Sequence, residues 1–180
     1  MQLSQLNANN GNSISDFVGG STGSTNYYLI NRAKELKFKN FRGVFMRDEL
    51  KERIKKAALK PFEKQESGIM NFDVSSDPGS HWVAWYKDCE NEKNRPEKLF
   101  YFDSYGTAVP DELREYLCYG SKKIGFKKNI LENKKILRSD FMIQGVNSDI
   151  CGELCCLFIY MMDTTDLSYR DIIRNIHDFG

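Results

Sequence analysis

The segment from Cys151 to Met162 is the feature that most constrains the fold of this chain. From Leu154 onward its residues are apolar on every side of a helix, a pattern typical of a helix buried inside a protein rather than lying on its surface. Three residues just before it carry side-chain oxygens that can cap a helix N-terminus: Asn147, Ser148 and Asp149. We therefore predict a central, buried helix over residues 150–162.

Cys151 is expected in the first turn of this helix, where free backbone N–H groups and the positive end of the helix dipole stabilise a thiolate. Gly152 places no side chain beside the sulfur, so that a substrate backbone or another strand can come close. A histidine partner would complete the activation by holding the pair as thiolate and imidazolium. Cys151 is therefore the candidate nucleophile, whereas Cys155 and Cys156 are interpreted as small core residues.

The chain contains two histidines, and His81 is the one placed for this role. It follows a Pro78-Gly79 turn and opens an apolar strand, whereas His177 lies near the end of the chain and is interpreted as structural. Asp103 ends a second, aromatic strand, where its carboxylate can hydrogen-bond the imidazole and fix its tautomer. The alternative for Asp103 is a plain Asx-turn.

Gln144 precedes Cys151 by seven residues and follows a short apolar run. Its amide N–H₂ group, together with the backbone N–H of Cys151, can form an oxyanion hole for a tetrahedral intermediate. A structural role is the alternative for this glutamine. The four residues in this order supply every part that a thiol acyl-transfer site needs.

Three blocks of sequence resemble the adenovirus-type maturation proteases. They are Gly-Ser-His-Trp-Val-Ala at 79–84, Tyr-Phe-Asp-Ser-Tyr-Gly at 101–106 and the stretch from Gln144 to Gly152. Proteases of Polinton-type transposons and of virophages are similar, and the SUMO-specific proteases are more distantly similar. With two upstream blocks at 41–50 and 68–73, the resemblance covers about residues 27 to 162.

The resemblance implies an α+β, papain-like or adenain-like cysteine protease fold, in which the central helix packs on an antiparallel sheet. It also implies four roles: His81 as general base and acid, Asp103 as its orienting carboxylate, Gln144 in the oxyanion hole and Cys151 as nucleophile. Two positions depart from the pattern. Asp103 stands where the adenoviral enzymes typically have Glu, and Glu153 stands where an apolar residue is common; we expect Glu153 to be solvated on the far side of the helix.

The predicted function is that of a cysteine endopeptidase that processes viral or virus-like capsid precursors at sites containing Gly-Gly or Gly-x-Gly. An isopeptidase acting on SUMO or ubiquitin-like conjugates is the main alternative. A non-proteolytic acyltransferase and a binding protein on the same fold also remain open.

Composition agrees with a small enzyme. The chain has 180 residues, 41% of them hydrophobic, which suits one domain. Its net charge of +1 gives no global argument for nucleic-acid or membrane binding, no apolar run approaches a membrane span, and no signal pattern opens the sequence. Five cysteines, three of them in one helix, do not form a disulfide framework or a zinc motif. We expect a monomer without metal in an intracellular, reducing compartment, namely host nucleus or cytoplasm, and the virion if the element is viral.

The stretch 122–138 is rich in basic residues. Its cations are Lys122, Lys123, Lys127, Lys128, Lys134, Lys135 and Arg138. A solvated lysine face is the favoured interpretation, and contact with DNA phosphates is the alternative. No cofactor is required, although the family resemblance implies stimulation by DNA or by a peptide activator.

Local patterns also predict the remaining elements. Residues 1–26 read as a flexible tail and 27–180 as a single cysteine protease domain. Expected helices are 28–37, 48–59, 110–118 and 168–178, and expected strands are 69–74, 81–87, 98–103 and part of 136–143. In the tail, the run from Phe17 to Ser21 contains Gly19-Gly20; we interpret it as a linker, with self-cleavage before Ser21 as the alternative.

Overall fold

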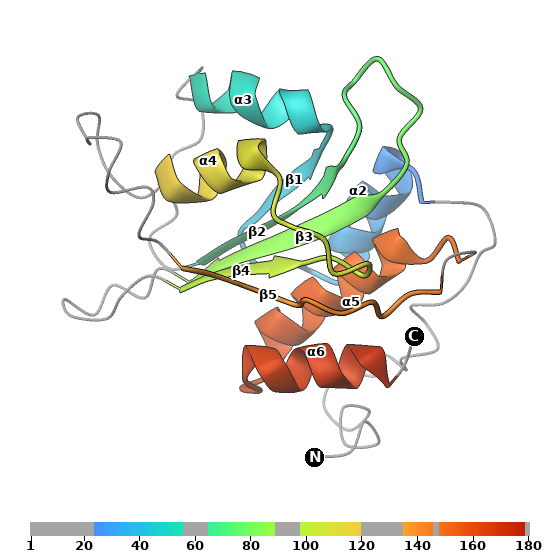
Figure 1. Ribbon diagram of the computed structural model, residues 1–180, viewed down its shortest axis with the longest axis vertical. Coiled ribbons are helices and arrows are strands. Elements are labelled where there is room, and N and C mark those ends of the chain that lie inside the picture. The colour runs from blue at the N-terminus through green and yellow to red at the C-terminus, as the bar shows by residue number, and fades with distance from the viewer. Residues whose placement is uncertain (1–23, 56–64, 89–97, 120–134, 146–147, 179–180) are drawn as a thin grey trace.

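The computed structural model describes residues 24–55, 65–88, 98–119, 135–145 and 148–178. In these ranges a five-stranded sheet has helices on both faces, with α3 and α4 on one side and α2, α5 and α6 on the other (Figure 1). The strands are β1 Phe41–Phe45, β2 Gln65–Asn71, β3 Trp82–Asp88, β4 Lys98–Phe102 and β5 Ile136–Arg138. The helices are α2 Asn26–Glu35, α3 Arg47–Lys55, α4 Asp111–Tyr119, α5 Cys151–Thr164 and α6 Tyr169–His177.

The sheet has the order β1-β2-β3-β4-β5 and is mixed. The central strands β2, β3 and β4 are antiparallel, as predicted, but β1 is parallel to β2 and β5 is parallel to β4. Parallel neighbours need a crossover connection, and α3 and α4 lie in the two connections that supply it. No strand was predicted at 41–45, because Arg42 and Gly43 interrupt the alternation of apolar residues there.

Strand β3 is covered on both faces. Successive side chains of a strand point to opposite faces, so Trp82 and Ala84 pack in the core beside α5, whereas Val83 and Trp85 pack in the core beside α3 and α4. Gly68 on β2 allows Trp85 to lie flat against the sheet, because a Cβ at this position would come within 2.2 Å of the indole ring. This double burial explains why β3 is apolar at nearly every position.

Helix α5 confirms the prediction of a central, buried helix. It contacts β3 on one side and lies between α2 and α6 on the same face of the sheet (Figure 1). The ring of Phe158 stacks on Phe102 of β4 with centroids 5.1 Å apart. Because neighbours surround the helix, an apolar residue is favourable on every side of it. No helix in the described part of the chain is long and apolar enough to cross a membrane.

The other predicted helices occur within about two residues of their expected starts. Helix α3 is described as far as Lys55, and the rest of the predicted helix 48–59 lies outside the described residues. Residues 1–23 of the predicted tail 1–26, residues 89–97 and most of the basic stretch 122–138 also lie outside them.

Candidate active site

His81 and Asp103 are brought together by the antiparallel pairing of β3 and β4. His81 immediately precedes β3 and Asp103 immediately follows β4, so the start of one strand meets the end of the other. Nε2 of His81 lies 2.6 Å from Oδ1 of Asp103, and both side chains are buried. The carboxylate also accepts hydrogen bonds from the backbone N–H of Tyr105, at 2.8 Å, and from the N–H and hydroxyl of Thr107. Sequence reasoning missed Thr107, which completes the hydrogen bonding of Asp103.

These contacts favour the charged forms of both residues. Burial alone would raise the pKa of Asp103, but hydrogen bonds from His81, Thr107 and Tyr105 outweigh it and hold that pKa below its usual value. Burial alone would lower the pKa of His81, but the hydrogen bond to Asp103 and the neighbouring Cys151 outweigh it and raise this pKa to about 9. The imidazolium is therefore the favoured form of His81 near neutral pH.

Cys151 is the first residue of α5 and is 7% exposed. Nδ1 of His81 is buried and has no hydrogen-bond partner among the described residues, while Cys151 is close enough to raise the pKa of the same imidazole. The sulfur therefore lies beside the ring without an aligned hydrogen bond. Catalytic hydrogen bonds are often long before substrate binds.

The predicted cap of α5 is wrong. The N-cap residue is Ile150, which makes no side-chain hydrogen bond to the helix, and Ser148 and Asp149 precede it. Asn147 lies outside the described residues. Because an apolar residue occupies the capping position, its side chain does not compete with an anion for the first N–H groups of the helix.

Gln144 lies in the same cavity as Cys151. Its Oε1 accepts a hydrogen bond of 2.8 Å from the hydroxyl of Ser104, and the carbonyl of Ser148, which can only accept, identifies Nε2 as the donor end of the amide. Nε2 donates to the carbonyl of Ser148 and, over 3.4 Å, to the hydroxyl of Tyr105. The backbone N–H of Gln144 donates to the carbonyl of Ser104, so the turn after β4 anchors the loop that follows β5.

The cavity beside Cys151 has a volume of about 340 Å³. One wall is the segment Ser24–Asn26, here named the N-terminal strap, and another is the turn 78–80 ahead of His81. Trp82, Tyr105, Gln144, Ser148, Asp149 and Cys151 complete the lining. Small and polar side chains dominate the two walls, so the cavity suits an extended backbone with small residues. Sequence reasoning did not anticipate the strap in this position.

The prediction that Glu153 is solvated is wrong. Its side chain is 6% exposed and accepts a hydrogen bond of 2.9 Å from the hydroxyl of Ser24. Burial raises the pKa of Glu153, opposed by the hydrogen bond from Ser24 and by the positive charge of Arg32. The strap and α2 cover the side of α5 that was expected to face water.

The cysteines deeper in α5 are core residues, as predicted. Burial raises the pKa of Cys156 to about 12 and holds that of Cys155 well above its usual value. His177 is exposed on α6 and lies apart from the catalytic cavity. The described residues contain no cluster of three His, Cys, Asp or Glu side chains with the geometry of a metal site.

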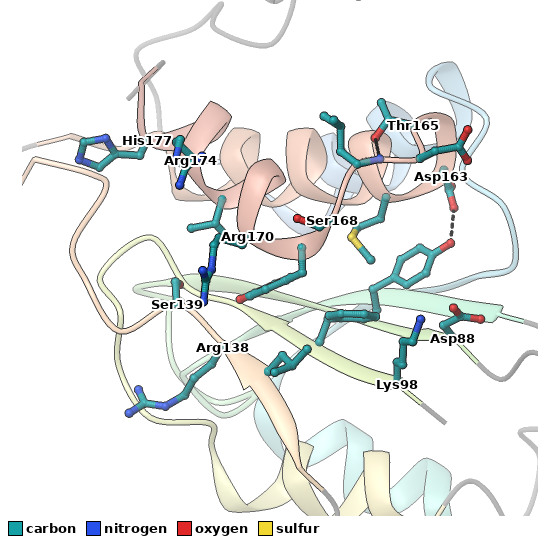
Figure 2. A pocket seen from close by; sticks show the side chains of 18 of the residues that line it. Asp88, Lys98, Arg138, Ser139, Asp163, Thr165, Ser168, Arg170, Arg174 and His177 are labelled. Atoms are coloured by element: carbon teal, nitrogen blue, oxygen red, sulfur yellow. Dashed lines mark hydrogen bonds between the residues drawn. The ribbon is translucent and has the colours of Figure 1, made fainter. Parts of the chain in front are cut away.

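A second, larger hollow of about 1620 Å³ lies between β5, the end of α5 and α6 (Figure 2). Arg138, Arg170 and Arg174 line it, and at its other end Tyr86 donates a hydrogen bond to Asp163. None of the four candidate catalytic residues lines this hollow. Two of them, Gln144 and Cys151, line the smaller cavity instead.

Of the seven basic residues singled out in 122–138, the structure describes Lys135 and Arg138. The guanidinium of Arg138 donates to the carbonyls of Gly106 and Thr107, at 3.4 and 3.3 Å, and is exposed. It thus contacts the turn that holds Asp103. The other five lie outside the described residues.

Comparisons with known proteins identify the fold. No protein-family model matches the chain, and no curated protein matches it in sequence. A crystal structure of the ASFV pS273R protease superposes with a TM-score of 0.57 at 18% identity, covering 89% of this chain and 66% of that one. Its Se-Met form gives a TM-score of 0.55 at 15% identity, with 89% and 67% coverage. This chain therefore spans about two thirds of the length of that protease.

A structure of the SUMO protease Ulp1, with its catalytic cysteine oxidised to a sulfinic acid, superposes with a TM-score of 0.48 at 18% identity. That superposition covers 98% of this chain and 84% of Ulp1. The match to the pS273R protease, together with the five-stranded sheet and its helices, confirms the predicted α+β, adenain-like cysteine protease fold.

Proposed function

We propose that this chain is a cysteine peptidase that cleaves peptide bonds through an acyl-enzyme on Cys151. The observation that carries the proposal is the buried 2.6 Å contact between His81 and Asp103, with the second ring nitrogen of His81 left for Cys151 at the start of α5. A buried carboxylate on one ring nitrogen and a thiol beside the other is the arrangement that activates a nucleophilic cysteine.

In the acylation step, the Cys151 thiolate attacks the carbonyl carbon of the scissile bond while His81 is an imidazolium. A C–S bond forms and the carbonyl oxygen becomes an oxyanion. His81 then transfers its proton to the leaving amine, the C–N bond breaks, and a thioester remains on Cys151. Asp103 holds the ring in place and stabilises its positive charge before the proton leaves.

In the deacylation step, neutral His81 takes a proton from a water molecule, whose oxygen adds to the thioester carbonyl. Collapse of the second tetrahedral intermediate breaks the C–S bond and releases a carboxylic acid. Cys151 returns as a thiolate and His81 as an imidazolium, so the charges at the end of the cycle equal those at the start.

The oxyanion of both intermediates would be bound by Nε2 of Gln144 and the backbone N–H of Cys151. The long contact of 3.4 Å from Gln144 to the Tyr105 hydroxyl is the weaker of the two that its amide donates, so a substrate oxygen can replace it. Ser104 keeps the donor end of the amide in place during the exchange.

For the substrate we propose capsid precursor proteins of a virus or virus-like element, cut at Gly-Gly or Gly-x-Gly sites. The narrow cavity with small polar walls supports a preference for small residues beside the scissile bond. We also propose that the chain works in a reducing compartment, because the reaction needs a free thiolate. As predicted from the sequence, we propose that it acts as a monomer. Contact of Lys135, Arg138 and the rest of 122–138 with DNA stays the alternative to a solvated lysine face and is supported by their charge alone.

The experiment is to incubate the wild type and Cys151→Ala with Gly-Gly peptides and, separately, with ubiquitin-like conjugates. Cleavage of the Gly-Gly peptides but not of the conjugates, by the wild type and not by Cys151→Ala, supports the endopeptidase. Cleavage of conjugates alone would replace it with an isopeptidase that uses the same four residues. Turnover of neither substrate would overturn both and leave an acyltransferase or a binding protein on this fold.

A further inference from the structure

Ser24 joins the two elements that carry the candidate nucleophile and base. Its hydroxyl donates to Glu153 at 2.9 Å, two residues beyond Cys151 on α5. Its carbonyl accepts a hydrogen bond of 2.8 Å from the indole N–H of Trp82, the residue after His81. One residue of the N-terminal strap is thus attached to the neighbours of both Cys151 and His81.

A third contact sets how closely the strap approaches α5. A Cβ at Gly152 would come within 2.5 Å of Cβ and Oγ of Ser24 and within 3.0 Å of the Leu29 side chain. No side chain could therefore occupy this position unless the strap moved away. The glycine beside the sulfur is required by the strap, in addition to any requirement of the substrate.

The strap is continuous with α2, which packs against α5. The side chain of Thr25 caps α2 by accepting the N–H of Tyr28 at 3.1 Å. Ser24 is therefore held from the helix side as well as by Glu153 and Trp82. A buried carboxylate needs a hydrogen-bond donor, and Ser24 supplies one to Glu153.

The strap forms a wall of the catalytic cavity and does not fill it. Ser24, Thr25 and Asn26 line the space of about 340 Å³ that remains beside Cys151, and the turn 78–80 also lines it. A substrate chain that reaches Cys151 through this space would contact the strap. The position of the strap therefore sets the width of the cavity next to the nucleophile.

We propose that Glu153 and Trp82 are positioning residues that hold the N-terminal strap as the substrate-binding wall of the catalytic cavity. This inference rests on the proposed peptidase function for its kinetic part. Glu153 acts through Ser24 and does not touch the reacting atoms. Loss of the contact should widen the cavity and weaken substrate binding, while the Cys151–His81–Asp103 arrangement stays in place.

The test compares Ser24→Ala, Glu153→Leu and Glu153→Gln with the wild type. Hydrogen exchange of residues 24–30 and the rate of Cys151 alkylation by iodoacetamide are measured first, because neither needs a substrate. The values of kcat and KM then follow for a Gly-Gly peptide that the wild type cleaves. Ser168→Ala is the control, since it removes another hydroxyl-to-carboxylate hydrogen bond, to Asp171 on α6, and Ser168 does not line the catalytic cavity.

Ser24→Ala and Glu153→Leu should speed exchange of 24–30 and raise KM about threefold to tenfold, the effect of one lost hydrogen bond of ordinary strength. Their alkylation rates and kcat should stay within about twofold of wild type. Glu153→Gln keeps an acceptor oxygen and should restore the wild-type KM. The double variant Ser24→Ala/Glu153→Leu should be no worse than either single one, because both remove the same bond.

Unchanged exchange and unchanged KM in Ser24→Ala would overturn the inference. So would a loss of kcat and of alkylation with KM unchanged, because the contact would then support the nucleophile itself. A KM as high in Glu153→Gln as in Glu153→Leu would also overturn it. If the wild type cleaves no peptide, the proposed function fails, and exchange of residues 24–30 alone decides whether Glu153 holds the strap.

Discussion

The ring of Tyr105 lies against the imidazole of His81, with centroids 4.5 Å apart and planes inclined by 32°. The hydroxyl of the same tyrosine accepts the long hydrogen bond from Gln144. Phe72 contacts another side of the imidazole edge-on, with centroids 5.1 Å apart. One aromatic residue thus touches both the candidate base and the candidate oxyanion donor, and two rings restrict the motion of His81.

Two substitutions of Tyr105 distinguish its ring contact with His81 from its hydrogen bond with Gln144. Tyr105→Phe keeps the ring and removes only the hydroxyl, so kcat/KM should stay within about threefold of wild type. Tyr105→Ala removes the ring as well and should lower kcat/KM about tenfold to a hundredfold, because His81 gains freedom. Steady-state kinetics on a Gly-Gly peptide measure both. Equal losses in the two variants would show that the hydroxyl, not the packing, matters.

Cys151 should react with iodoacetamide near pH 6 far ahead of the other four cysteines. Among the three cysteines whose side chains the structure describes, it alone combines a helix N-terminus with a histidine partner, whereas burial raises the pKa of Cys155 and Cys156. Peptide mapping by mass spectrometry identifies the labelled residue. His81→Ala should abolish the selectivity. Similar labelling of all five cysteines in the folded wild type would contradict the thiolate–imidazolium pair.

The alkaline limb of the pH–activity profile should report His81. Its pKa is raised to about 9, so the imidazolium persists through neutral pH and is lost as pH rises through that value. We expect kcat/KM to fall above about pH 9. The stability that His81 contributes should be fully present below pH 6.5 and should be lost as pH rises from there through about 9. The limb should move to lower pH in Asp103→Asn, which removes a contact that raises this pKa.

The control for the pH experiment is Asp178→Asn. Asp178 lies 3.5 Å from His177 on the surface, so this variant removes a carboxylate beside the other histidine. Its alkaline limb should coincide with that of the wild type. An alkaline limb that stays in place in Asp103→Asn would show that His81 is not the group being titrated.

Gly68→Ala tests the packing of the sheet. A Cβ at Gly68 would lie 2.2 Å from the ring of Trp85, which is fully buried between β2 and α4 side chains. We expect a loss of about 1–3 kcal/mol in the free energy of unfolding, as for other overpacked cores. Urea denaturation measures it. Gly145→Ala is the control, because a Cβ there meets nothing within 4 Å.

The tail offers a test of self-processing. Residues 19–21 lie outside the described part of the chain, but Ser24 lines the cavity that contains Cys151, and three residues of extended chain span about 10 Å. If Gly19-Gly20 enters the cavity of its own or another copy, purified wild type should contain a species beginning at Ser21. Intact-mass measurement should find it missing from Cys151→Ala. Wild type that stays full length on prolonged incubation would leave the run as an ordinary linker.

The sequence by itself determined the central helix and the members of the candidate site. Apolar residues on every side of α5 are favourable only where neighbours surround the helix. The local sequence pattern was therefore enough to predict that this helix is buried. Local patterns also predicted that His81 lies at the start of one strand and Asp103 at the end of another. Antiparallel pairing of adjacent strands then brings the two side chains together.

Only the tertiary structure decided which residues surround that site. Ser24 and Glu153 are 129 positions apart, and neither carries a local signal of the other. Glu153 looked solvated because helical spacing shows where a side chain points, but not which distant segment covers it. Strand β1 and the strap beside Cys151 depend on the same long-range packing. Contacts between segments far apart in the chain form through the folded backbone, and single-sequence periodicity does not encode them.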